Sequence, residues 1–464
     1  MKIIIRFALL TLLLSTGVFI TMAIPFLSFS NSLLWFLSTF MIGAGLALVA
    51  KHCGRGALLL AIPISVLSAN ALVVHIWPPL VRNSVLRAFN EVAKRDDDYR
   101  QLRKQVLPIT LQSLEVPAPL QQGWNHGERA LEVAHGVSVS LFATGLNQPY
   151  ALAVNERGVL FVSLPKVGQV VALVDKDGDG ITEETHVIAS GFDRPSGLAF
   201  KKGVLYVATA SRVFALHDND GDFEVERQQV IYDQLPAAKH HWAHALVVGA
   251  DQQLYLSVGA EVGDEHWQRA SVLRLSDSGS VTLHATGLYD CQGLAVHPKS
   301  GSIWATDDGP ELLGFYVHPD ELNVLVVDGD YGWPFCYGDR LPDADLGSPE
   351  ICRSTQSSIL QLPANASPRG LAFGDQIKGS SPYQSMLYMV LQGANYGKRQ
   401  QGFRLMGVPL SAEGRILGWG VDLVSGWSVE GKPWGEPTDC VVGADGALYV
   451  TDQRAGCVYR VSFE

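Results

Sequence analysis

The sequence predicts an all-β, six-bladed β-propeller that follows an α-helical membrane anchor of three helices. The propeller is indicated by a short pattern that occurs six times, first as PYALAV at residues 149–154 and then from residues 195, 243, 291, 368 and 437. Measured from Leu152, successive copies are 46, 48, 48, 77 and 69 residues apart. A period in the forties, built from short strands and tight turns, is typical of one propeller blade.

The residues between the copies support this interpretation. Most copies are followed by a polar turn with Gly, Asn or Asp and then by a second apolar run, such as VLYVA at residues 204–208. Helical solenoids have similar periods, but they lack this richness in β-branched and aromatic residues. The two long steps predict larger insertions after blades four and five.

Three apolar segments precede the repeats and predict a membrane anchor over residues 1–78. Residues 7–29 and 33–50 carry no charged side chain, and residues 57–77 carry only His75. Each segment is long enough for the ~20 helical residues that cross a bilayer core. A cleaved signal peptide is the alternative for the first segment. Its apolar run is too long for that, and no small-residue cleavage site stands out.

The basic residues that flank the spans predict their orientation. Lys2 and Arg6 precede the first span, and Lys51 and Arg55 lie between the second and the third. The positive-inside rule places these residues in the cytoplasm. Four basic residues within 82–95 argue the other way, but large domains translocate largely regardless of charge. We therefore expect a multi-pass protein of a bacterial inner membrane, with the propeller on the periplasmic or extracellular side.

Between the anchor and the propeller, which we assign to residues 136–464, lies a linker at residues 79–135. Apolar residues at helical spacing, Val85, Phe89 and Val92, predict a helix in it. The formal net charge of −11 argues against nucleic acid as a partner.

The cysteines indicate an oxidising compartment. Cys336 and Cys352 bracket a loop rich in Gly, Pro and Asp, and we expect a disulfide between them. Cys440 and Cys457 lie on the first and third apolar runs of the last blade, so a second bridge and two free thiols are equally expected there. Cys53 lies in the proposed cytoplasmic loop and is expected to be free.

One position of the repeat is expected to line the mouth of the central channel, where each innermost strand begins. Five of its six residues are polar without being acidic, which suits an anionic or hydroxylated ligand. The alternative is a hydrated channel that binds nothing. The six residues are Tyr150, Ser196, His244, Gln292, Arg369 and Thr438.

The segment KHHWAH contains three histidines, His240, His241 and His244. Successive strand residues point to opposite faces, so the histidines do not converge simply on a metal. Because imidazole titrates near neutral pH, base chemistry by one of them is more plausible. For any single one of them, a structural role is about equally expected.

Two acidic stretches, DKDGDG at residues 175–180 and DNDGD at residues 218–222, are similar to calcium loops. The first matches the opening of an EF-hand loop, but its twelfth position is His186 where that loop needs Glu. Both stretches lie between β runs, so a hairpin turn rich in Asp is favoured over a metal site.

Several motifs in and after the fourth blade are more specific. With them, the chain resembles the glucose/sorbosone dehydrogenase family of pyrroloquinoline quinone (PQQ) enzymes over about residues 140–462. The paired Cys336 and Cys352 are most similar to the sorbosone and pyranose dehydrogenase branch. The motifs are DGP at 308–310, DELN at 320–323, YGWP at 331–334 and the C-terminal GADGALYVTD at 443–452.

The resemblance implies a catalytic base and a metal site. The family's base is a His that opens the third blade and is followed five residues later by Leu, which matches His241 and Leu246. The catalytic Ca²⁺ is held partly by the backbone carbonyls of a Gly-Pro pair, which matches Gly309 and Pro310.

The resemblance also implies a second, structural Ca²⁺ near Asp320, Glu321 and Tyr331. Arg and Lys side chains of blades five and six are expected to bind the three cofactor carboxylates. The residues expected at the cofactor are Arg369, Lys398, Arg399, Arg404, Gln292 and Tyr289.

The chain departs from the family at residues 287–293. The usual GHRNPQG is GLYDCQG here, so Tyr289 stands where an Arg normally reaches the cofactor or substrate. Asp290 adds a negative charge where a tricarboxylate is expected. Arg369, at a mouth position of the next blade, is the candidate to compensate.

The resemblance implies a membrane-anchored quinoprotein dehydrogenase that oxidises an aldose or sugar aldehyde with PQQ and Ca²⁺. Its partners would be the sugar, the lipid bilayer, and a membrane quinone or cytochrome as electron acceptor. One alternative is a non-catalytic propeller that has lost PQQ and binds a glycan or a protein. Another is a calcium-dependent hydrolase such as a lactonase, which needs several carboxylate and Asn ligands at the channel centre.

Overall fold

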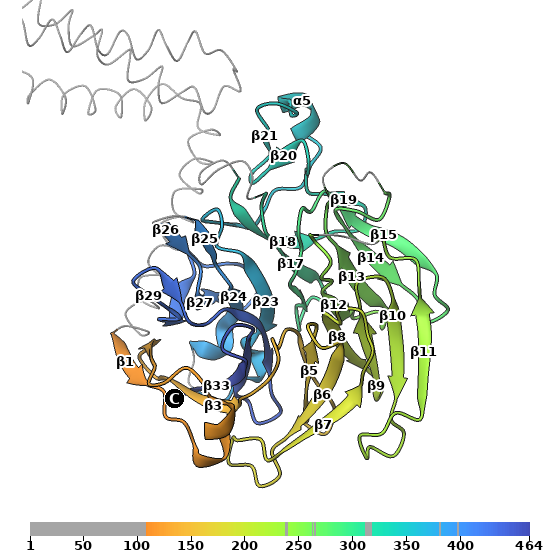
Figure 1. Ribbon diagram of the computed structural model, residues 1–464. Helices are drawn as coiled ribbons and strands as arrows, with labels where there is room; N and C mark the ends of the chain where they lie inside the picture. The colour runs from red at the N-terminus through yellow and green to blue at the C-terminus, as the bar shows by residue number, and fades with distance from the viewer. Residues whose placement is uncertain are drawn as a thin grey trace, which may run out of the picture. The chain divides into compact units, whose positions relative to one another are not determined.

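Figure 1 shows the computed structural model, which describes residues 108–236, 240–261, 263, 266–310, 318–379, 382–396 and 399–464. The three predicted membrane spans and Val85, Phe89 and Val92 of the predicted linker helix lie outside these residues. Among the residues that the structure describes, no helix is long and apolar enough to cross a bilayer.

The described chain forms the predicted ring of six antiparallel blades (Figure 1). In blades one to three, four consecutive strands run from the centre outward. They are β4 (Leu152–Val154), β5 (Leu160–Leu164), β6 (Gln169–Val174) and β7 (Glu184–Ala189) in blade one, β8 (Gly197–Lys201), β9 (Val204–Ala208), β10 (Val213–His217) and β11 (Arg227–Tyr232) in blade two, and β12 (Leu246–Val248), β13 (Leu254–Val258), β14 (Ser271–Leu275) and β15 (Val281–Thr286) in blade three.

Blades four to six follow the same plan, with other segments inserted between their strands or paired to their outer edges. Their principal strands are β16 (Leu294–Val296), β17 (Ile303–Asp307), β18 (Asp320–Leu325) and β22 (Leu360–Leu362) in blade four, β23 (Pro368–Phe373), β24 (Met386–Leu391), β27 (Arg404–Pro409) and β28 (Val421–Ser425) in blade five, and β31 (Pro437–Val442), β32 (Leu448–Asp452) and β33 (Cys457–Phe463) in blade six. Short elements between them are η4 (Gly374–Gln376), η5 (Tyr383–Ser385), β25 (Ala394–Tyr396), β26 (Arg399–Gln401), β29 (Ser428–Val429) and β30 (Lys432–Pro433).

The ring is closed by an early strand. β3 (Val137–Ala143) pairs antiparallel with β33, so the first and last strands of the propeller share one sheet. The innermost strands contact one another in turn around the ring, and β31 contacts β4. All six copies of the sequence pattern coincide with these innermost strands, which confirms the predicted blade count.

Blade five is extended by two strands from the segment that we assigned to the linker. β2 (Ala130–Ala134) pairs with β28, and β1 (Ile109–Ser113) pairs with β2. The 3-10 helix η2 (Ala118–Gly123) lies between them. This part of the segment therefore belongs to the propeller sheets.

Glycine in the repeat is explained by the close approach of neighbouring innermost strands. A Cβ at Gly293 would lie 2.0 Å from the backbone oxygen of Arg369, and a Cβ at Gly197 would lie 2.5 Å from that of His244. A side chain at either position would push adjacent blades apart. The pattern therefore encodes the packing around the channel.

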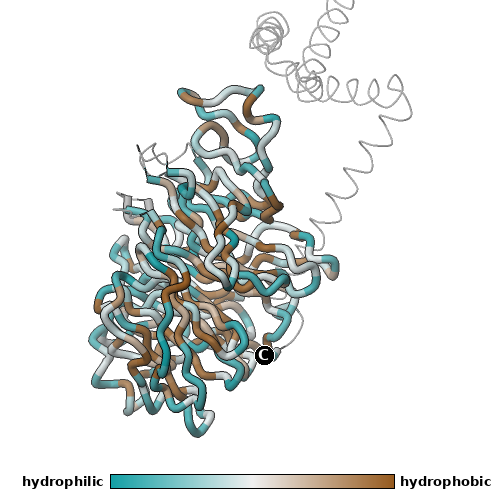
Figure 2. Tube along the Cα trace, turned by 90° about the vertical axis from the view of Figure 1, so that its right-hand side faces the viewer, coloured by the Kyte–Doolittle hydropathy of each residue, from teal (hydrophilic) through white to brown (hydrophobic). Residues whose placement is uncertain are grey.

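The core lies between the blades. All residues of β13 (LYLSV) and of β24 (MLYMVL) are buried, because these strands are covered by a neighbouring sheet on each face. Figure 2 shows hydrophobic stretches through the interior of the propeller and hydrophilic residues at its loops.

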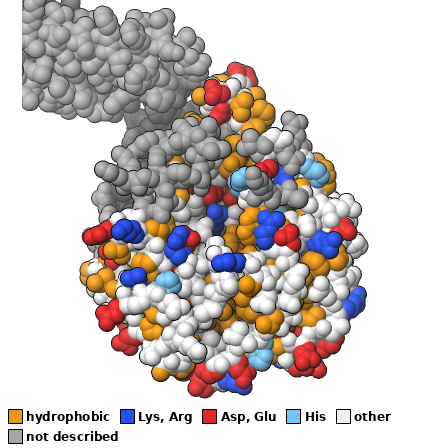
Figure 3. All heavy atoms as spheres, viewed as in Figure 1, with side chains coloured by type: hydrophobic (Ala, Val, Ile, Leu, Met, Phe, Trp, Pro, Cys, Tyr) orange, Lys and Arg blue, Asp and Glu red, His pale blue; other side chains and the backbone are white. Residues whose placement is uncertain are grey.

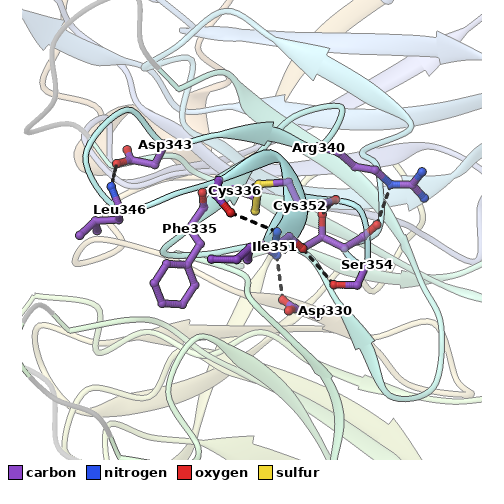
Figure 4. The surroundings of a disulfide bond; sticks show 12 residues. Asp330, Phe335, Cys336, Arg340, Asp343, Leu346, Ile351, Cys352 and Ser354 are labelled. Atoms are coloured by element: carbon purple, nitrogen blue, oxygen red, sulfur yellow. Dashed lines mark hydrogen bonds between the residues drawn. A yellow bond between two sulfur atoms is a disulfide. The ribbon is translucent and has the colours of Figure 1, made fainter. Parts of the chain in front are cut away.

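The first long insertion lies inside blade four, between β18 and β22, and not after that blade. It forms an arm with β19 (Gly329–Asp330), β20 (Cys336–Tyr337), β21 (Leu341–Pro342) and α5 (Pro349–Cys352). The predicted disulfide between Cys336 and Cys352 is confirmed and joins β20 to α5 (Figure 4).

The possible second disulfide, between Cys440 and Cys457, is wrong, and both residues are buried free thiols. Cys440 lies on β31 and Cys457 on β33, and β32 separates these strands in the sheet. Strands that are not adjacent are about 10 Å apart, which is beyond the ~7 Å between Cα atoms that a disulfide can span.

Candidate active site

A cavity of about 700 Å³ opens at the channel mouth where the innermost strands begin and the second strands end. It brings together side chains from distant parts of the chain. The residues that line it are Tyr150, His240, His241, Trp242, Ala243, Glu261, Tyr289, Asp290, Gln292, Asp308, Gly309, Arg369, Gln392 and Gln453.

His241 enters the cavity from the loop that precedes β12. Its Nδ1 is hydrogen-bonded to the carbonyl oxygen of Ala260. Because a carbonyl only accepts, Nδ1 must carry the proton, and Nε2 is left with a lone pair. The ring packs edge-on against Tyr289, with centroids 4.8 Å apart. The backbone thus fixes His241 in the tautomer that a general base requires.

The other two histidines of the segment have different surroundings. His240 is exposed, and its backbone N–H donates to Glu261 Oε2 over 3.2 Å. His244 is 1 % exposed and bonded through Nδ1 to the carbonyl oxygen of Ser257 at 2.8 Å. Burial lowers the pKa of His244, so it is neutral at physiological pH. His241 is therefore the best placed of the three to act as a base.

Arg369 lies at the start of β23 and is held by three residues. Its Nε donates to Gln392 Oε1 at 2.9 Å, and its two terminal nitrogens lie 3.4 and 3.5 Å from carboxylate oxygens of Asp290 and Asp308. The side chain is 15 % exposed. The guanidinium is thus a buried, oriented cation at the cavity wall.

A chain of hydrogen bonds connects Arg369 to the far side of the mouth. Gln292 Nε2 donates to Asp290 Oδ2 at 2.8 Å, and the Tyr150 hydroxyl donates to Gln292 Oε1. Burial raises the pKa of Tyr150 to about 12, so the phenol keeps its proton and remains a donor. Residues from blades one, four and five therefore form one polar network.

The backbone of Gly309 is held in place by Asp320. The N–H of Gly309 donates to Asp320 Oδ1 at 3.0 Å, and the N–H of Ser367 donates to Asp320 Oδ2 at 2.9 Å. Burial, with the nearby Asp308 charge, raises the pKa of Asp320 well above its usual range. Asp320 acts here as a backbone acceptor. Pro310 follows Gly309 and is half-buried.

Asp320, Glu321 and Tyr331 each have hydrogen-bond partners of their own. Adjacent residues of β18 face opposite ways, and Glu321 accepts from the N–H of Gly338 and from Asn323 Nδ2. The Tyr331 hydroxyl instead donates to the carbonyl oxygen of Val324, in β18, and accepts from the N–H of Val326, just after that strand. The structural calcium site that the resemblance implies near these three residues stays a prediction.

Acidic oxygens do approach one another in the two hairpin loops, which lie along the lower edge in Figure 3. Asp175 accepts from the N–H groups of Gly178 and Gly180 at 2.7 and 2.9 Å, as expected for an Asx turn. The groups whose oxygens lie within 4.8 Å of one another are Asp175, Asp177, Asp179 and Glu183 in one loop and Asp218, Asp220, Asp222 and Glu226 in the other.

Asp439 is the carboxylate near the channel centre, where a hydrolase would hold its metal. Its oxygens accept from the N–H groups of Leu152 and Cys440, both at 2.8 Å. Burial raises its pKa to about 7. Among the described residues that line this part of the channel, neither Asn nor Glu occurs. The channel thus lacks the ligand set that the hydrolase alternative requires.

The remaining predicted cofactor residues differ in their placement. Gln292 and Tyr289 line the cavity with Arg369. Arg404 lies on β27, pairs with Asp422 at 2.9 Å and lines a separate cavity of about 360 Å³. Lys398 lies outside the described residues, as does the side chain of Arg399.

Several residues of the cavity were not predicted from the sequence, namely Glu261, Asp308, Gln392, Gln453 and Trp242. Four of them follow the second strand of a blade, whereas the repeated pattern marks the first strand. Asp308 had a signal, because it opens the DGP motif.

Comparisons with known proteins agree with the resemblance found in the sequence. Residues 126–289 match a family described as a domain of unknown function (DUF7133). The chain is 23% identical to aldose sugar dehydrogenase YliI of *Escherichia coli*, over 50% of this chain and 64% of the relative. It is 27% identical to quinoprotein glucose dehydrogenase B of *Acinetobacter calcoaceticus*, over 28% of this chain and 33% of the relative.

A solved structure, the holo form of the pyranose dehydrogenase PQQ domain from *Coprinopsis cinerea*, superimposes with a TM-score of 0.62. It is 15% identical and covers 75% of this chain and 100% of that chain. At this identity the match shows a shared fold. Together with the relatives, it supports the resemblance to PQQ-dependent aldose and glucose dehydrogenases.

Proposed function

We propose that this protein is a quinoprotein dehydrogenase that oxidises an aldose or sugar aldehyde, with PQQ as cofactor and Ca²⁺ as metal. The observation that carries the proposal is that His241, Arg369 and Gly309, from blades three, five and four, line one cavity. In the proposed reaction His241 is the base, Arg369 binds a carboxylate of the cofactor, and Gly309 offers a carbonyl ligand to the metal.

The cavity suits a divalent cation. Asp290, Asp308 and Glu261 line it together with a single described Arg or Lys, Arg369. Asp290 is 4 % exposed, and its Oδ1 accepts no hydrogen bond from the described residues. A buried carboxylate oxygen in this position favours a bound cation. Carbonyl oxygens such as those of Gly309 and Pro310 are ligands that Ca²⁺ prefers.

The cavity also suits a planar aromatic acid once a cation is present. Tyr289 and Trp242 supply aromatic surface to the lining, and Arg369 supplies an oriented guanidinium for a carboxylate. Since Asp290 and Asp308 share the charge of Arg369, further cations are needed for three carboxylates. Lys398 and Arg399, which the resemblance implies at the cofactor, are the candidates.

PQQ bound at this mouth would supply a hydride acceptor, and Ca²⁺ would supply a Lewis acid for its quinone oxygens. His241 takes the proton of the sugar hydroxyl at Nε2, while the Ala260 carbonyl keeps its Nδ1 protonated. Gln392 and Asp290 hold Arg369 in one orientation. Tyr150 and Gln292 hold Asp290 in turn.

The test is sugar-dependent dye reduction by purified protein with added PQQ and CaCl₂, over a panel of aldoses. We expect activity that His241→Ala lowers by about 10² to 10⁴-fold in kcat. His186→Ala, which changes a half-buried histidine on the outer strand of blade one, is the matched control and should keep wild-type activity. Absence of activity with every aldose, together with no PQQ binding by calorimetry, would refute the proposal.

One observation favours a second candidate, a propeller that has lost PQQ and binds a glycan or a protein. Tyr289 stands where the family's Arg is expected, and two carboxylates accompany Arg369. A sugar that binds at this mouth in the absence of PQQ, with no turnover in its presence, would support this candidate.

We further propose that residues 1–78 anchor the protein in a bacterial inner membrane with the propeller outside. Electrons would then pass to a membrane quinone or a cytochrome. The support is the three long apolar segments and the confirmed disulfide, which fits an oxidising compartment. Protease added to spheroplasts should digest the propeller, and protection of the propeller would contradict this topology.

A further inference from the structure

The arm inserted in blade four exposes a large share of the apolar surface of the propeller. Seven of the sixteen large hydrophobic side chains that are exposed among the described residues lie in this insertion, residues 326–359. Single exposed hydrophobic side chains are ordinary, whereas a cluster of them marks a surface that contacts a partner or a membrane. Four of the seven belong to the projecting part of the arm, namely Phe335, Leu341, Leu346 and Ile351.

The fold of the arm does not depend on a hydrophobic core. The disulfide joins β20 to α5, and Asp343 Oδ1 accepts from the N–H of Leu346 at 2.9 Å. The hydroxyl of Ser348 accepts from the N–H of Ile351 at 3.3 Å. Figure 4 shows Phe335, Leu346 and Ile351 around this framework. Because a disulfide and hydrogen bonds hold the backbone, the apolar side chains are free to face outward.

The arm projects from the rim of the propeller that holds the mouth cavity (Figure 1). At its foot Trp333 packs edge-on against Tyr289, with ring centroids 4.5 Å apart, and the N–H of Trp333 donates to the carbonyl oxygen of Gly287 at 3.0 Å. Tyr289 lines the mouth cavity together with His241. A surface that covers the arm would therefore lie beside the mouth.

The rest of the chain indicates that this surface is lipid. Residues 7–29, 33–50 and 57–77 are predicted to cross a bilayer, and they belong to the same polypeptide as the arm. Such a tether would keep lipid near the arm at a high effective concentration. Phe, Leu and Ile are side chains that insert at the boundary between headgroups and acyl chains.

The charge of the arm argues against a second copy of this chain as the partner, because two acidic surfaces repel each other. It also means that insertion of apolar side chains, and not attraction to anionic headgroups, would hold the arm on a bilayer. The charged residues of the arm are Asp339, Asp343, Asp345, Glu350, Arg340 and Arg353.

We propose that the arm rests on the bilayer surface, with Phe335, Leu346 and Ile351 inserted among the lipids. The inference rests on the membrane anchor proposed above, and it gives these residues no part in the reaction. Its consequence is that the mouth of the channel lies next to the membrane, where a lipid-soluble electron acceptor is within reach.

The test measures how deeply single fluorescent labels enter the bilayer, with the full chain in vesicles of phosphatidylcholine. Leu346→Cys carries an NBD label on the arm. Val187→Cys, on the outer strand of blade one, is the matched control, since the two native side chains are 56 % and 54 % exposed. Both variants also carry Cys53→Ser, because the other cysteines are buried or bonded.

Phospholipids with a nitroxide just below the headgroup should lower the fluorescence of the label at position 346 about twofold and leave the label at position 187 unchanged. Phe335→Ser combined with Ile351→Ser should abolish this quenching without altering thermal unfolding. The quenching should occur in phosphatidylcholine alone, and a strict need for phosphatidylglycerol would contradict insertion by apolar side chains.

The remaining outcomes separate the arm from the anchor. A label at position 346 that is quenched no more than the control would overturn the inference and leave the anchor in place. Self-quenching between labelled copies, with no effect of nitroxide lipid, would assign the arm to a second copy and also overturn it. If alkaline carbonate extracts the chain, the anchor is rejected, and added vesicles then decide on the arm: a quenched label at position 346 retains the inference, and an unquenched one overturns it.

Discussion

Glu321→Gln is expected to stabilise the protein at alkaline pH. Glu321 is 6 % exposed and accepts hydrogen bonds from the N–H of Gly338 and from Asn323 Nδ2. Burial raises its pKa from 4.5 to about 7. A glutamine keeps one acceptor for Gly338. Its amide N–H can donate to Asn323 Oδ1 once the Asn323 amide turns over, and this oxygen is buried and accepts no hydrogen bond from the described residues.

The magnitude follows from the difference between the folded and unfolded pKa values of Glu321. Because the folded value is the higher one, the favourable contribution is fully present below pH 4.5 and is lost as the pH rises through about 7. Ionising the folded carboxyl then costs about 3 kcal/mol more than ionising the unfolded one. Glu321→Gln should therefore match wild type at pH 4.5 and gain up to about 3 kcal/mol in unfolding free energy at pH 8.

The assay is urea unfolding of wild type and variant at pH 4.5, 6 and 8, with EDTA and with CaCl₂. A gain that grows with pH in EDTA supports burial as the cause. A loss of stability at pH 8 in EDTA would refute the reasoning. A loss confined to CaCl₂ would instead show that Glu321 is the calcium ligand implied by the resemblance.

Three other predictions concern named contacts. Replacing Cys336 and Cys352 by Ser should cost about 3 kcal/mol of stability, since a loop of this length is released, and limited proteolysis should then cleave the arm first. Asp290→Asn should tighten PQQ binding about tenfold and weaken Ca²⁺ binding in calorimetry, because Arg369 loses a partner at 3.4 Å, and unchanged affinities would contradict the assigned charge balance. His244→Ala should lower the unfolding free energy by about 2 kcal/mol, because it removes a buried, bonded side chain, and a wild-type value in urea unfolding would show that His244 is not structural.

The blade plan was predictable from the sequence because the repeat encodes contacts that occur in almost every blade. At Gly293 and Gly197 the backbones of adjacent blades lie too close for a side chain. Because this close approach occurs at the innermost strands, the pattern marks those strands. β1 and β2 had no such signal, since they attach to blade five at its outer edge and carry no copy of the pattern. The third and fourth strands of blade four, β18 and β22, also carry no copy of the pattern. The spacing between copies therefore did not reveal that the first insertion lies between these two strands.

The candidate site was predictable where a motif lies next to an innermost strand. His241 and Arg369 meet this condition, and the structure brings both to one cavity. Gln392 and Gln453 do not, since each follows a second strand, and the packing of blade five against blade six brings them together. Arg404 was expected at the cofactor, but its strand directs it to Asp422 on the neighbouring strand of the same blade.

The pairing of β3 with β33 has a consequence for biosynthesis. Residues 137–143 leave the ribosome about 320 residues before their partners, Cys457–Phe463, are made. Blades one to four can assemble during translation, but the sixth cannot be completed until residues 457–463 have been made. Contacts of such long sequence separation form slowly, so a nascent chain that stalls late in synthesis would expose the hydrophobic edge of an open ring to aggregation.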